Sequence, residues 1–110
     1  MTSDRYAEYG FETLANVTHV ISWMPPRMIK GRGPGFWEIR ILADYDAPDS
    51  AEPFGDFDAR RDASAEEIGR LTAEQVGFPV RLEAGEQEIR LSRFGARTTT
   101  EPIYFARRTS

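Results

Sequence analysis

FWEIRILA, residues 36–43, is the stretch that decides the fold. Its apolar side chains alternate with Glu38 and Arg40, which is the two-residue period of a strand with one buried face. VTHVISWM, residues 17–24, is likewise rich in β-branched and aromatic residues. The two prolines that follow it should end the strand, because proline cannot donate a hydrogen bond to a sheet. These two stretches, joined by a glycine-rich connection, predict a β-hairpin with a long loop.

A helix is predicted over residues 64–76. Ser64 and Glu67 form a capping box, in which the hydroxyl and the carboxylate each satisfy a backbone N–H at the helix start. Gly77 and Pro79 then end the helix. The residues that recur at helical spacing are Ile68, Leu71, Thr72, Gln75 and Val76.

Three further strands are predicted after the helix, over residues 80–83, 88–94 and 102–107, with turns at residues 84–85 and at Gly95. Their expected core residues are Leu82, Ile89, Leu91, Ile103 and Phe105. Five or six strands with one helix predict an α+β domain, mostly an antiparallel curved sheet or a partly open β-barrel. Residues 1–15 fit a helix and a strand equally well.

The composition indicates one soluble domain. The chain has 110 residues, no cysteine and no repeat, so residues 1–110 are expected to form a single globular domain without disulfides. No stretch approaches the roughly 20 apolar residues that a membrane span needs. The polar start, MTSDRYAEYG, carries no export signal, and we therefore expect a cytoplasmic protein.

The net charge of −4 is unevenly distributed. Residues 44–58 contain six acids and no base, and the rest of the chain has 12 acids against 14 bases. Two stretches, residues 27–43 and 89–108, are basic. Blocks of one sign bear on the partners of a protein rather than on its fold.

The acidic stretch falls in residues 44–62, which show no sustained period and are predicted to form a long loop. Aromatic side chains lie between its acids and offer contact area, while the acids favour encounter with a basic partner. The alternative is a covering loop whose phenylalanines pack on their own sheet. The candidate partner-binding residues are Asp44, Tyr45, Asp46, Asp49, Glu52, Phe54, Asp56, Phe57 and Asp58.

Catalytic and metal chemistry find little support in the sequence. His19, the only histidine, is expected on the same strand face as Val17 and Ile21, half-buried and bonded to a neighbour, whereas Ser22 faces the opposite way. The acids do not match a calcium-loop pattern, because Pro48 occupies a needed position. The glycine-rich residues 31–35 precede a strand and not a helix, unlike phosphate-binding loops. We therefore expect no enzyme, no cofactor and no metal site.

A second hypothesis uses the basic stretches. A hairpin at residues 27–40, together with C-terminal arginines, could contact a nucleic acid or another phosphate ligand. The sequence pI of about 5.0 argues against nucleic acid as the main partner. The candidate anion-binding residues are Arg27, Lys30, Arg32, Arg40, Arg93, Arg97, Arg107 and Arg108.

The sequence therefore favours a small non-enzymatic interaction domain that engages a basic surface on a partner protein. Such a domain could act as an inhibitor, as an immunity or anti-defence factor, or as a subunit of an assembly. Association of the chain with itself is left open, and no membrane partner is expected.

Overall fold

The structure is a computed structural model that describes residues 14–26, 34–42, 52–91 and 97–109; the side chains of residues 89–91 and 97 are not described. Within these ranges the chain folds into five strands and a helix, the small α+β fold predicted from the sequence. None of the described helices has the length and the apolar character needed to cross a membrane.

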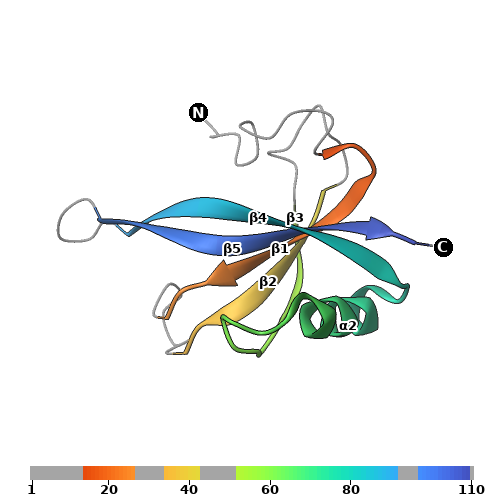
Figure 1. Ribbon diagram of the computed structural model, residues 1–110, viewed down its shortest axis with the longest axis horizontal. Coiled ribbons are helices and arrows are strands. Elements are labelled where there is room, and N and C mark those ends of the chain that lie inside the picture. Colours follow the sequence, from red (N-terminus) through yellow and green to blue (C-terminus); the bar gives the residue numbers. More distant parts are fainter. Residues whose placement is uncertain (1–13, 27–33, 43–51, 92–96, 110) are drawn as a thin grey trace.

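The described strands form one antiparallel sheet in the order β3-β2-β1-β5-β4. The sheet is curved and does not close, so β3 and β4 are its two edges. Figure 1 shows the helix against one face and the hairpin of β4 and β5 extending past the end of β1. The strands are β1 (Val17–Met24), β2 (Phe36–Ile41), β3 (Glu52–Phe57), β4 (Val80–Leu91) and β5 (Arg97–Arg108).

Helix α2 (Ala65–Val76) begins and ends at the residues that the sequence indicated. The Ser64 hydroxyl accepts a hydrogen bond of 3.2 Å from the backbone N–H of Glu67, which satisfies one of the free donors of the first turn. Gly77 ends the helix in the left-handed conformation with φ 87°, which glycine adopts without a Cβ clash. The chain then turns into β4.

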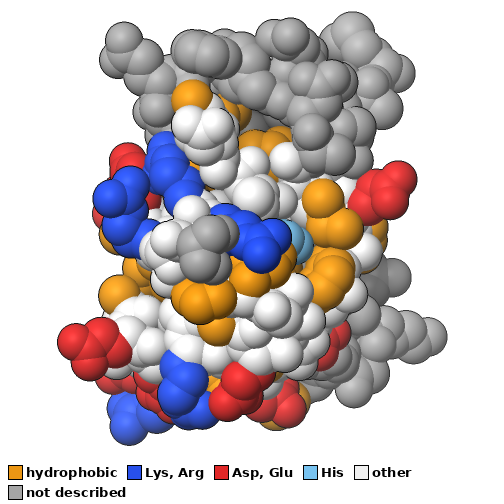
Figure 2. Space-filling model, turned by 90° about the vertical axis from the view of Figure 1, so that its right-hand side faces the viewer, with side chains coloured by type: hydrophobic (Ala, Val, Ile, Leu, Met, Phe, Trp, Pro, Cys, Tyr) orange, Lys and Arg blue, Asp and Glu red, His pale blue; other side chains and the backbone are white. Residues whose placement is uncertain are grey.

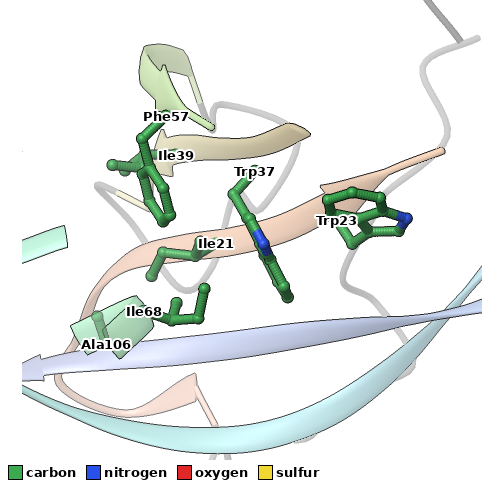
Figure 3. Close-up of a cluster of buried hydrophobic side chains, with 7 residues drawn as sticks. All are labelled: Ile21, Trp23, Trp37, Ile39, Phe57, Ile68 and Ala106. Carbon is green, nitrogen blue, oxygen red and sulfur yellow. The ribbon is translucent and has the colours of Figure 1, made fainter. Parts of the chain in front are cut away.

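The main core combines Ile68 of α2 with residues of the sheet, and Figure 3 shows its buried side chains. Trp37 is fully buried there, and its indole N–H donates to the carbonyl of Arg60 at 3.1 Å, so the ring carries no unsatisfied donor. The buried members of this cluster are Ile21, Trp23, Trp37, Ile39, Phe57, Ile68 and Ala106. A second buried cluster contains Leu14, Val17, Val20, Leu42, Ile103 and Phe105.

A β-bulge at the start of β1 separates two residues expected on one face. The register with β5 shifts between Val17 and His19, so one extra residue stands in β1 at Thr18. Val17 therefore joins the second cluster with Val20, whereas Ile21 belongs to the main core under α2. The expected common face of Val17 and Ile21 was wrong for this reason.

Residues 52–57 form the edge strand β3, although residues 44–62 were predicted to be a loop. In β3 only Phe57 is buried, so the sequence carries no alternation of apolar and polar residues. Pro53 is compatible with an edge strand, because only one side of such a strand bonds to a neighbour. Residues 43–51 lie outside the described ranges.

Residues 80–91 form one continuous strand, so the predicted turn at residues 84–85 was wrong. Gly85 serves close packing instead: a Cβ built there would lie 3.1 Å from the Phe105 ring and 3.3 Å from the Ile103 side chain. The strand β5 also begins earlier than predicted and contains Pro102. Its ladder with β1 stops at Ile103, next to this proline, which has no N–H to donate.

Candidate functional site

The described part of the acidic stretch, residues 52–58, consists of the edge strand β3 and the residue that follows it. Glu52, Asp56 and Asp58 are exposed. The remaining candidates, Asp44, Tyr45, Asp46 and Asp49, lie outside the described residues.

The two phenylalanines of β3 have different environments. Phe57 is 8% exposed and belongs to the main core, so it is not available at the surface. Phe54 is 42% exposed and is the one large hydrophobic side chain exposed among the described residues. The register with β2 shifts so that Phe54 is an extra residue between the partners of Ile39 and Arg40. Because of this bulge, Phe54 lies on the same face as Phe57 despite their spacing of three.

His19 lies beside Phe54 where α2 ends. Its ring contacts Phe54 edge to face, with centroids 5.2 Å apart, and Phe78 with centroids 5.9 Å apart. Its Nδ1 lies 2.9 Å from the Thr18 hydroxyl, and that hydroxyl donates to the carbonyl of Ala106 at 3.3 Å. Because the hydroxyl proton is used in this way, Nδ1 must donate to the Thr18 oxygen, and Nε2 is then the acceptor of the neutral ring. The expected bond to a neighbour was confirmed, whereas the ring is more deeply buried than the half-buried histidine that was expected.

Burial lowers the pKa of His19 below its ordinary value of 6.5, because an imidazolium would lose hydration there. Nε2 has no hydrogen-bond partner among the described residues. His19 is therefore a mostly neutral imidazole at pH 7.

His19 also lines an open groove of about 1090 Å³ across the ends of four strands. Figure 2 views the molecule from this side and shows the chain's single histidine, in pale blue, beside Lys or Arg side chains in blue and hydrophobic side chains in orange. No carboxylate is among the described residues that line it. They are Asn16, Val17, Thr18, His19, Ile41, Leu42, Phe78, Arg81, Arg107, Arg108 and Thr109.

The basic residues of the groove come from the paired ends of β4 and β5. Arg81 stands directly opposite Arg107 in the ladder. Arg107 donates to Glu83 at 2.7 Å and to the carbonyl of Ala15 at 3.2 Å. The guanidinium carbon of Arg108 lies 4.6 Å from the centroid of the Phe78 ring. This end of the hairpin is therefore rich in positive charge.

The other candidate anion-binding residues do not join the groove in the part of the chain that is described. Arg40, in β2, pairs with Glu38 at 2.7 Å and is partly buried. Arg97 begins β5, but its side chain is not described. Arg27, Lys30, Arg32 and Arg93 lie outside the described ranges. Of the predicted residues whose side chains are described, Arg107 and Arg108 line the groove and Arg40 does not.

Sequence reasoning missed Phe78 and Arg81. A signal for Arg81 was present, because one long hairpin centred near Gly95 places residue 81 opposite residue 107. The turn predicted at residues 84–85 hid that pairing. Phe78 follows the helix stop at Gly77, and nothing local in the sequence indicates that it supports an arginine from β5.

The side chains gathered here suit binding by aromatic contact, cation–π stacking and charge-assisted hydrogen bonds. Among the described residues, no three acidic or histidine side chains come together as metal ligands. No protein-family model, curated protein or solved structure shows significant similarity to the chain.

Proposed function

We propose that the protein is a non-enzymatic interaction domain that adds an extended, basic segment of a partner protein to the outer edge of β3. The observation that carries this proposal is the exposed Phe54 on an edge strand whose other exposed side chains include Glu52 and Asp56. Large exposed hydrophobic groups surrounded by charge are typical of interaction sites.

An edge strand offers backbone donors and acceptors that an extended peptide can pair with, and side chains that then select the peptide. The Gln75 side chain donates a 3.3 Å hydrogen bond to the carbonyl of Asp56. Helix α2 therefore covers the C-terminal end of the β3 edge. We therefore place the incoming strand alongside residues 52–55. Phe54 supplies the apolar anchor, and the acids set the preference for a basic segment.

A second copy of the chain fits this edge poorly. Pairing of two β3 edges puts two copies of the same exposed acids, Glu52 and Asp56, at one interface, and like charges brought together across a sheet are destabilising. A basic segment meets the same carboxylates favourably. The charge of the edge thus favours a partner of a different sequence, whether the protein serves as an inhibitor, an immunity or anti-defence factor or an assembly subunit in the cytoplasm.

The proposal is tested with a ten-residue peptide of alternating lysine and valine, titrated into ¹⁵N-labelled protein while the amide resonances are followed. We expect shifts in residues 52–58 and in β2, and a weaker response to the corresponding glutamate and valine peptide. The double variant Glu52→Gln and Asp56→Asn should weaken binding roughly fivefold, since exposed charge pairs contribute up to about 1 kcal/mol each.

The matched control is Glu86→Gln with Glu88→Gln, which removes the same charge from exposed positions of the opposite edge strand β4. This control should bind the lysine peptide as the unmodified protein does. Equal binding of the lysine and glutamate peptides, or equal weakening by the two double variants, would remove the basis for the proposal.

A further inference from the structure

The first five residues of β4, VRLEA (residues 80–84), alternate between the two faces of the sheet. Val80 and Leu82 pack against the main core on the face that α2 covers. Arg81 and Glu83 therefore point to the opposite face, and both are exposed. Because β4 has a described neighbour on one side only, β5, the backbone groups of its other side can pair with a further strand.

A groove of about 510 Å³ runs between this edge and α2. Its helix side includes Gly69 and Ala73, which carry little or no side chain and so leave space beside Leu82. Even a Cβ built at Gly69 would lie 3.6 Å from the Leu82 side chain. A strand added beside β4 therefore finds room for apolar side chains on the α2 face.

On the other face, Arg81 meets a like charge within the sheet. It stands directly opposite Arg107 of β5, an arrangement that costs stability. It forms no ion pair with any residue in the described ranges. Glu83 accepts from Arg107 through Oε2 at 2.7 Å, yet its side chain is 56% exposed, so the carboxylate can accept from a second guanidinium. An acid placed beside Arg81 and a base placed beside Glu83 would therefore complete this edge.

The edge is complementary to itself. When two copies of β4 pair antiparallel about a two-fold axis at Leu82, Arg81 of each copy lies opposite Glu83 of the other. On the α2 face Leu82 then lies opposite its own copy, and Val80 lies opposite Ala84, so these facing pairs are apolar. An axis at Arg81 or at Glu83 would instead place that residue opposite its own copy and bring like charges together. Charge thus favours the register centred on Leu82.

We infer that two copies of the chain associate through β4, with residues 80–84 of each copy paired antiparallel about Leu82. Pro79, which has no N–H to donate, limits the length of the ladder. We therefore expect a weak, reversible dimer, with an interface smaller than the roughly 1,600 Å² of a standard complex. The inference does not depend on the proposed function, although the dimer would present two copies of the β3 edge at the ends of one continuous sheet.

The test is sedimentation equilibrium of the full chain from micromolar to millimolar concentration. The average mass should rise from 12.5 kDa toward twice that value and no further, because a two-fold pairing closes on itself. In ¹⁵N-labelled protein, the amide resonances of residues 80–84 should shift over the same concentration range, whereas those of residues 52–58 should not.

Two charge reversals test the register. Arg81→Glu and Glu83→Arg should each weaken association at least tenfold, since each brings two pairs of like charges together. An equimolar mixture of these two variants should associate again, because every acid of one then lies opposite an arginine of the other. Arg81→Glu leaves the bond between Glu83 and Arg107 in place and tests the register by itself if Glu83→Arg does not fold.

The matched controls are Arg60→Glu and Glu88→Arg, which make the same charge changes at exposed positions outside residues 80–84. Both controls should associate as the unmodified protein does. Tryptophan fluorescence reports whether each of the four variants is folded.

Four outcomes would overturn the inference. The first is a mass that stays at 12.5 kDa at millimolar concentration. The second is equal weakening by Arg81→Glu and by its control Arg60→Glu. The third is a mass that grows beyond that of a dimer, which would indicate open-ended pairing of unlike edges. The fourth is a concentration-dependent shift confined to residues 52–58, which would assign the contact to β3. The peptide titration of the β3 edge is a separate measurement, so either proposal can fail without the other.

Discussion

Two regions on the helix-bearing face of the sheet use aromatic side chains in opposite ways. In the helix-covered region, Trp37 contacts Trp23 and Tyr104 with ring centroids 5.5 and 5.7 Å apart. In the strand-end region, which comprises His19, Phe54, Phe78 and Arg108, ring centroids lie at similar distances of 5.2 and 5.9 Å. The ring geometries are alike, but Trp23 and Trp37 are buried, whereas Phe54 is 42% exposed.

The end of α2 accounts for this difference. Gly77 terminates the helix, so no described helical residue covers the sheet beyond it. Where the helix lies on the sheet, apolar contacts with Ile68 bury the aromatic rings and stabilise the fold. Beyond the helix, Phe54 and part of Phe78 remain accessible beside arginines and an edge strand with acids. One face of a small sheet can thus serve both stability and binding, divided by the residue at which a helix ends.

The comparison predicts that the two phenylalanines of β3 differ most in their effect on stability. Phe57→Ala should lower the free energy of unfolding by about 3–5 kcal/mol, because it removes a buried ring from the main core. Phe54→Ala should cost about 1 kcal/mol or less, since that side chain is 42% exposed. Urea denaturation followed by tryptophan fluorescence measures both.

Since Phe57→Ala could unfold the chain, Phe57→Leu provides a second measurement. It keeps much of the apolar volume and should cost less than the alanine variant. Equal costs for Phe54→Ala and Phe57→Ala would show that the two regions are not divided as described.

The second prediction concerns the residue that divides the regions. Gly77→Ala should destabilise the protein by about 1 kcal/mol, because alanine must adopt φ 87° at the helix end. Gly69→Ala, in the same helix, should instead stabilise it by about 0.5–1 kcal/mol. A Cβ at Gly69 meets Leu82 at an ordinary contact distance of 3.6 Å. Thermal unfolding of both variants checks the opposite signs, and a stabilising effect at Gly77 would contradict this account of the helix end.

The third and smallest effect is the dependence of stability on pH through His19. Burial lowers the pKa of the folded-state imidazole, so the unfolded chain binds the proton more readily. The stability that the neutral ring contributes is complete above pH 6.5 and decreases as the pH falls below that value. We expect a lower free energy of unfolding at about pH 5.5 than at about pH 7.5, and a smaller difference in His19→Gln. His19 is the only histidine and the chain has no cysteine, so an undiminished difference in His19→Gln would exclude this role.

Local patterns in the sequence were enough to predict β1, β2 and α2. Each has a clear period or a capping residue, and Ser64 and Gly77 act as predicted. The strand β3 could not be predicted in this way, because only Phe57 of its residues is buried and a bulge interrupts its register. Gly85 misled the prediction, since its function is close packing against Phe105 and not a turn.

The candidate site was harder to predict because it depends on contacts between distant parts of the chain. Arg107 and Arg108 were identified from their charge alone, but their neighbours Arg81 and Phe78 required the register of β4 and β5. His19 was correctly expected to bond to a neighbour, yet its contact with Phe54 required β3 to exist as a strand. Pairing across a sheet is the information that a single sequence lacks.

The most direct test of the division between the two regions is a pair of measurements on the variant Phe54→Ala. Its affinity for the lysine and valine peptide and its free energy of unfolding are measured in the same buffer. The account predicts that affinity falls at least tenfold, because the apolar anchor is lost, while stability changes by about 1 kcal/mol or less. A large loss of stability with unchanged affinity would contradict it, because Phe54 would then belong to the core and not to a binding surface.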